Sequence, residues 1–68
     1  MNIKEVAENL RVAIASKEQL LEEWKTVDEE EWIQAGVSYS AMSRMVEINI
    51  NELRNILADV EQCVGSDE

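Results

Sequence analysis

Apolar residues in the first third of the chain recur at alternating steps of three and four positions. This spacing places them on one face of an α-helix, and it continues for more than three heptads. Asn2 suits the N-cap position, and Glu5 stands three residues later, as in a capping box. We therefore predict a long helix over residues 3–26. Its apolar line comprises Ile3, Val6, Leu10, Ala13, Lys17, Leu20, Trp24 and Val27, and it is widened by Ala7, Ile14 and Leu21.

A second line with the same spacing occupies the last part of the chain. Ser38 or Ser40 is the expected N-cap, and Gly65 is the expected stop signal. We predict a helix over residues 39–64, followed by a frayed tail at 66–68. The line comprises Tyr39, Met42, Val46, Asn49, Leu53, Ile56, Val60 and Cys63.

One segment of this second helix, residues 46–51, alternates between apolar and polar residues as a β-strand does. A single strand would have no partner in this chain, so we keep the helix. A break between residues 47 and 51 stays open as an alternative. Asn49 accordingly has two interpretations: a buried polar residue that fixes the register of helix pairing, or a residue at such a break.

An acidic segment joins the two lines. Thr26 and Glu29 have capping-box spacing, and Asp28 is an alternative cap; acidic side chains in a first turn face the positive end of the helix dipole. Gly36 follows at the position where a helix commonly ends in a left-handed residue. We predict a short acidic helix over residues 28–35, with a kinked continuation of the first helix as the alternative.

These elements predict an all-α fold. A helix over residues 3–26 would be roughly 36 Å long, and only a second long helix of this chain could cover its apolar face. We therefore expect one domain, residues 1–68, in which the two long helices form an antiparallel helical hairpin. A chain of 68 residues builds a small core, and its single cysteine cannot form an internal disulfide, so we also expect a homodimer. Val12 and Ala15 lie off the main line and would suit contact with a second copy.

The charge of the chain restricts its partners. Fifteen acidic residues against six basic residues give a net charge of −9. Binding to nucleic acid or to an anionic membrane draws on Lys and Arg, so both are disfavoured, whereas a partner with a basic surface is favoured. No stretch is long and apolar enough to span a membrane, and the N-terminus does not resemble a signal peptide. We expect a cytoplasmic protein in which Cys63 is a reduced thiol.

Catalytic chemistry has little support in the composition. The chain has no histidine to act as a general base, and Cys63 has no histidine to activate it. Zinc sites use mainly cysteine and histidine ligands, so a metal site is not expected. We predict a protein that is not an enzyme and that uses no cofactor.

The middle of the chain holds the candidate binding residues. Trp, Tyr and Arg dominate the energetics of many protein interfaces, and Met adapts to uneven surfaces. Trp24 and Met42 also fit the helical lines and are interpreted as core residues. We expect Tyr39 and Arg44 to be exposed, and replacing Tyr39 with Ala to weaken partner binding without changing the melting curve. The candidate partner-binding residues are Trp32, Ser38, Tyr39, Met42, Arg44 and Met45.

Residues 35–45 resemble the helix-turn-helix of lactose-repressor-type regulators. Ala35-Gly36-Val37-Ser38-Tyr39 matches the turn and the start of the recognition helix, and Ser43-Arg44 matches its continuation. This resemblance implies that Ser38, Tyr39, Ser40 and Arg44 would face DNA. The first half departs from the family, because Trp32 stands where Ala or Gly is usual and Glu31 where an apolar residue is expected.

The whole chain also resembles small phage-encoded anti-activators, through its length, its acidity and Tyr39 with its neighbours Ser38 and Arg44. These proteins block host quorum-sensing regulators at their DNA-binding domains. The resemblance implies a non-catalytic inhibitor that covers the basic, DNA-binding surface of a host transcriptional regulator. The alternatives are a small helix-turn-helix repressor that binds DNA itself, and a structural or antitoxin-like helical dimer.

Overall fold

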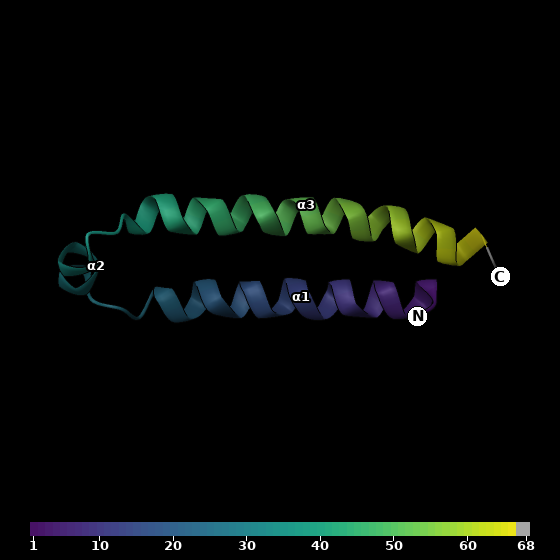
Figure 1. Cartoon of the computed structure of the whole chain (residues 1–68), viewed down its shortest axis with the longest axis horizontal. Helices are drawn as coiled ribbons and strands as arrows, with labels where there is room; N and C mark the ends of the chain where they lie inside the picture. The colour runs from purple at the N-terminus through teal and green to yellow at the C-terminus, as the bar shows by residue number, and fades with distance from the viewer. Residues whose placement is uncertain (67–68) are drawn as a thin grey trace.

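The structure is a computed structural model that describes residues 1–66, and within them it contains three helices and no strand. These are α1 (Ile3–Trp24), α2 (Glu29–Ala35) and α3 (Tyr39–Ser66). α1 and α3 lie side by side and run in opposite directions, and α2 lies crosswise at one end, between them in the chain (Figure 1). The predicted all-α class is confirmed.

α1 begins as its sequence predicts and ends two residues earlier. The side-chain oxygen of Asn2 accepts a hydrogen bond of 2.9 Å from the backbone N–H of Glu5. At the other end, the Thr26 hydroxyl donates to the carbonyl oxygen of Glu23 at 2.7 Å, and the Thr26 N–H bonds the same oxygen. The prediction of Thr26 as the cap of the next helix is therefore wrong, because its hydroxyl closes the end of α1.

Asp28 occupies the N-cap position of α2 in an extended conformation, and its carbonyl oxygen accepts from the N–H of Glu31. Its side chain makes no capping hydrogen bond. Gly36 ends the helix with φ 70° and ψ 27°, the left-handed conformation that its position predicts. Three acidic residues thus occupy the first turn of a helix of only seven residues.

α3 begins at Tyr39, after Ser38, whose hydroxyl oxygen accepts from the N–H of Ala41 at 3.1 Å. The helix continues through residues 46–51 without a break, as expected where no second strand exists to pair with. It also continues through Gly65, so the predicted stop is wrong: Gly65 lacks the positive φ that ends a helix at Gly36. The expected tail includes residues 67–68, which lie outside the described part of the chain.

The contact between α1 and α3 uses a different line on α3 from the one predicted. Tyr39, Val46, Leu53 and Val60 are partly buried as expected, but the positions between them are shifted by one residue. The structure places Ser43, Ile50, Leu57 and Val64 toward α1, whereas Met42, Ile56 and Cys63 are exposed.

Both lines have the same spacing, so periodicity alone does not separate them. The observed line buries Ile50 in the middle of the contact and leaves Asn49 at its edge, which avoids placing an amide in the centre. On α1 the buried residues are likewise Ala7 and Ile14, from the widened side, while Leu20 of α1 and Val27 beyond its end are exposed.

Ion pairs between the helices lie along one side of this contact. The Arg11 guanidinium pairs with Glu61 at 3.0 Å, and Arg54 pairs with Glu18 at 2.9 Å. The hydrogen bond from Arg11 to Glu61 raises the pKa of Arg11. The earlier residue of α1, Arg11, pairs with the later residue of α3, and the later residue of α1, Glu18, pairs with the earlier one, as oppositely directed helices require.

Candidate protein-binding site

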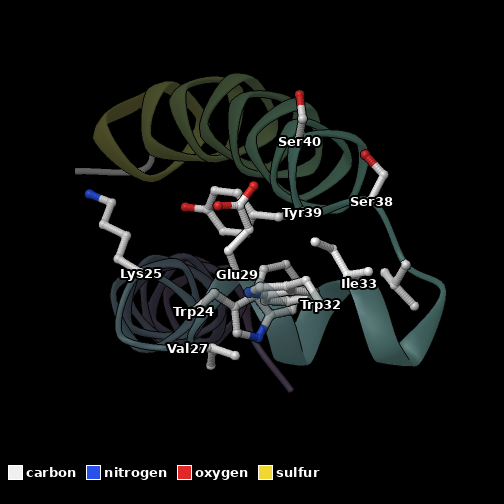
Figure 2. A pocket seen from close by; sticks show the side chains of 10 residues that line it. Trp24, Lys25, Val27, Glu29, Trp32, Ile33, Ser38, Tyr39 and Ser40 are labelled. Carbon is white, nitrogen blue, oxygen red and sulfur yellow. The ribbon is translucent and has the colours of Figure 1, made fainter.

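Three aromatic side chains meet at the end of the molecule where α2 lies. The ring centroids of Trp24 and Trp32 are 5.7 Å apart with an angle of 74° between the planes, and those of Trp32 and Tyr39 are 5.4 Å apart at 56°. Figure 2 shows the three side chains in the space between their helices. Edge-to-face and tilted contacts of this kind stabilise aromatic pairs beyond the area that they bury. The cluster therefore holds α2 against the ends of α1 and α3.

The positions of these residues follow from the local sequence. Trp24 is the last residue of α1, Trp32 lies in the middle of α2, and Tyr39 is the first residue of α3. The left-handed turn at Gly36 and the hydrogen bond from the Val37 N–H to the Trp32 carbonyl oxygen, 3.2 Å long, reverse the chain after α2. This turn brings the inner face of α2 back toward the start of α3.

An open pocket of about 550 Å³ lies beside the aromatic cluster (Figure 2). Its wall is mainly apolar, with Glu29 and Lys25 as its charged members. The Lys25 ammonium is bound to Glu22 at 3.0 Å, and this hydrogen bond raises the pKa of Lys25. The lining residues are Trp24, Lys25, Val27, Glu29, Trp32, Ile33, Val37, Ser38, Tyr39 and Ser40.

The outer side of α2 is acidic. Glu29, Glu30 and Glu31 are exposed, and no basic side chain of residues 1–66 forms an ion pair with them. Ile33, on the same helix, is 69% exposed although it is a large apolar residue. This end of the molecule consequently combines uncompensated negative charge with apolar surface.

The structure divides the six predicted binding residues into two groups. Trp32, Ser38 and Tyr39 line the pocket. Trp32 and Tyr39 are half-buried through their mutual contact, and Ser38 is exposed but uses its hydroxyl oxygen as the cap of α3. Tyr39 was expected to be an exposed contact residue; its packing on Trp32 means that Tyr39→Ala would also loosen α2.

The other three residues lie further along α3 and do not line the pocket. Met42 and Arg44 are exposed, and Met45 is 67% exposed. The Arg44 guanidinium makes no ion pair or hydrogen bond within the described residues. Met42 was interpreted as core, but the shifted contact line places it outside the α1–α3 interface.

Sequence reasoning missed the apolar edge of the pocket, formed by Val27, Ile33 and Val37. A signal for Ile33 was present. A helix of seven residues has about two turns, so its inner face accommodates few side chains, and Trp32 already occupies that face. The adjacent Ile33 is then left largely exposed, at the open edge of the pocket.

Other kinds of site have little in the geometry to support them. Among the residues that the structure describes, no group of three or more His, Cys, Asp or Glu side chains is placed to hold a metal ion. Cys63 is exposed near the C-terminal end of α3, whereas the pocket lies at the end where α3 begins. None of the described helices combines the length and the apolar character that a membrane crossing requires.

Comparison of the chain with protein-family models, with curated proteins and with solved structures found no match.

Proposed function

We propose that this chain is a non-catalytic protein-binding module whose recognition surface is the end formed by α2 and the adjoining turns. The observation that carries the proposal is the open apolar pocket beside three clustered aromatic rings, with the acidic face of α2 at its edge. Binding sites in proteins combine apolar walls with a few polar groups in this way. In this proposal α1 and α3 act as a helical hairpin that holds the recognition surface in place.

The partner that best fits this surface is a protein with a basic face that also presents an apolar side chain. Glu29, Glu30 and Glu31 supply negative charge without an ion-pair partner among residues 1–66, and such a field accelerates encounter with a positive surface. The apolar pocket then receives a side chain of the partner, and burial in the pocket slows dissociation.

The resemblance to phage-encoded anti-activators makes the proposal more specific. We infer that the partner is a cytoplasmic transcriptional regulator and that the chain inhibits it by covering its DNA-binding surface. A surface that binds phosphates offers the cations that the acidic face of α2 requires. Inhibition of this kind needs only binding, which suits a chain without a histidine.

The test compares two variants that change the net charge equally. Glu30→Gln with Glu31→Gln removes two charges from α2, and Glu52→Gln with Asp59→Asn removes two from α3, so each pair changes the net charge from −9 to −7. Affinity capture with quantitative mass spectrometry should recover a DNA-binding protein with the wild type and with the α3 variant. The α2 variant should recover much less of it, and so should Ile33→Ser.

The result that would contradict this proposal is equal recovery of every captured protein by the two charge variants. A second check uses the captured regulator in pure form with its DNA site: the chain should release the regulator from DNA, and added DNA should compete with the chain. Capture of nothing but copies of the chain itself would favour the structural or antitoxin-like alternative.

A helix-turn-helix function is the second candidate, and one observation favours it. α2 lies crosswise before a glycine turn, and Ser38, Ser40 and Arg44 are exposed at the start of α3 (Figure 1). The acidic first turn of α2 opposes it, because these carboxylates would lie close to DNA phosphates. A gel-shift experiment with the pure chain at low salt separates the two: sequence-dependent binding to DNA would displace the protein-binding proposal.

A further inference from the structure

One long side of the α1–α3 pair is mainly apolar, with the half-buried Lys17 as its charged member. On each helix, the residues of the interhelical ion pairs lie along one edge of the α1–α3 contact. Helical geometry places another row of residues along the opposite edge of this contact. On α3, the row along this opposite edge consists of Met42, Asn49, Ile56 and Cys63, and Asn49 is its one polar member. We call the residues along this edge of the two helices the apolar face. They are Val6, Ala13 and Leu20 of α1, Val27 in the segment after α1, and Met42, Asn49, Ile56 and Cys63 of α3.

The outer surface of α3 differs from this face. Met45 and Ile48 begin a second exposed line, but Glu52, Asn55 and Asp59 continue it, so it becomes polar after two turns. Large exposed apolar residues that extend along two helices mark an interaction surface, whereas isolated ones are ordinary. The apolar face is therefore the surface of the α1–α3 pair that lacks a covering partner.

The exposed area of the chain indicates how large that partner contact is. The chain exposes 5183 Å², whereas a compact monomer of 7.8 kDa exposes roughly 4,400 Å². The excess, about 800 Å², reflects the elongated shape of 52 × 16 × 15 Å, and it is comparable with the area that each partner buries in a standard protein–protein interface. Among the residues whose burial is described, only Ala7, Ile14 and Ile50 are buried, because two helices cannot enclose a core between them.

We propose that the apolar face binds the same face of a second copy, giving a four-helix bundle with the two copies in opposite orientation. The members of the apolar face are uncharged, and the neighbouring Lys17, which is half-buried, can keep its ammonium in water while its aliphatic stem lies on the apolar surface. The face is therefore compatible with itself, and two helix pairs stacked in this way enclose Leu20, Met42 and Ile56 in a common core. The interhelical ion pairs remain on the outside of the bundle. This inference concerns assembly and does not depend on the proposed target.

Charge decides the relative orientation of the copies. With the two α2 ends together, two sets of Glu29, Glu30 and Glu31 would lie close to one another. In the opposite orientation they are separated by about the length of the molecule, 52 Å, which far exceeds the screening length of about 8 Å at physiological salt. Repulsion between the acidic ends therefore favours the opposite orientation.

Asn49 fits this orientation. It lies 17 residues before the end of α3, or roughly 26 Å at 1.5 Å per residue, which is half the length of the molecule. Two copies that overlap fully in opposite directions place α3 on α3 and bring the two Asn49 side chains together at the twofold axis. Each amide can then donate to and accept from the other, and the single polar residue of the α3 line is satisfied.

The first test measures mass in solution by multi-angle light scattering and by sedimentation equilibrium. The wild type should have twice the chain mass of 7.8 kDa at micromolar concentration. Ile56→Glu should give the single-chain mass, whereas Ile48→Glu should leave the dimer intact. The two isoleucines are a matched pair, since both lie on α3 and both are 49% exposed in the single chain.

Loss of helical circular dichroism together with loss of the dimer in Ile56→Glu would also support the proposal, because the protomer core is small. A monomeric wild type would overturn the proposal, and so would a dimer that tolerates Ile56→Glu but not Ile48→Glu.

The second test examines the orientation by disulfide formation. Asn49→Cys in a Cys63→Ser background should form an intermolecular disulfide under mild oxidation, visible as a dimer on a non-reducing gel. Asn55→Cys in the same background is the control, because Asn55 lies on the outer line and should stay unlinked. If the α2 ends lay together, α3 would face α1 of the other copy, and a dimer without the residue 49 disulfide would overturn the opposite orientation.

Discussion

The two glycines of this chain should respond to the same substitution with opposite signs. Gly36 has φ 70°, whereas Gly65 lies inside α3 and has no positive φ. A Cβ atom built on either residue meets no heavy atom within 4 Å, so steric overlap does not contribute and the backbone conformation decides the outcome. Gly36→Ala and Gly65→Ala therefore form a matched pair of variants.

The expected magnitudes follow from the conformations. Alanine in the left-handed region costs roughly 1–2 kcal/mol, and the lower entropy of its unfolded chain offsets about 0.4–1 kcal/mol, so Gly36→Ala should destabilise the fold by about 1 kcal/mol. In a helix interior alanine is better than glycine by roughly 0.5–1 kcal/mol. Because Gly65 is the penultimate residue of α3, we expect a gain of about half that amount.

Thermal unfolding followed by far-ultraviolet circular dichroism measures both effects. A loss of about 1 kcal/mol lowers Tm by roughly 4–8 °C in a domain of this size. Protein concentration must be the same for all samples, because the stability of a dimer depends on it. An unchanged or higher Tm for Gly36→Ala would refute the left-handed turn, and would indicate that α2 and α3 join into one continuous helix.

Two further substitutions examine the α1–α3 contact. Ile50 is buried in the centre of this contact, so Ile50→Ala should lower the unfolding free energy by about 2–3 kcal/mol in urea titrations. Ile48→Ala, on the exposed side of α3, should change the unfolding free energy by less than about 0.5 kcal/mol. Equal effects of the two substitutions would place the contact on another face of α3. A double-mutant cycle with Glu18→Gln and Arg54→Gln should give a coupling of roughly 0.2–1 kcal/mol that weakens at high salt, and a coupling of zero at low salt would mean that this exposed ion pair does not form in solution.

Local signals predicted the ends of the helices well where side chain and backbone act together. Asn2, Gly36 and Ser38 each perform the role that their residue type and position indicate. Thr26 and Gly65 misled for a common reason: a hydroxyl can close one helix or open the next, and a glycine can end a helix or continue it. Contacts beyond the nearest neighbours decide such cases.

The facing sides of the helices were harder to predict. The choice between Asn49 and Ile50 as the central residue of α3 depends on what α1 presents, including Glu18 and Arg11, whose partners are far away in the sequence. The candidate binding site shows the same limit. Its aromatic residues stand out in the sequence, but the crosswise position of α2, which makes Ile33 exposed, arises only when three segments meet.

The aromatic cluster has a practical consequence for spectroscopy. The chain has two tryptophans, one tyrosine and no phenylalanine, and the cluster contains all three rings. Intrinsic fluorescence and near-ultraviolet dichroism therefore monitor the aromatic cluster alone, while the amide signal at 222 nm monitors the helices along their whole length. A fluorescence transition that precedes the amide transition on heating would show that the aromatic cluster comes apart before α1 and α3 separate.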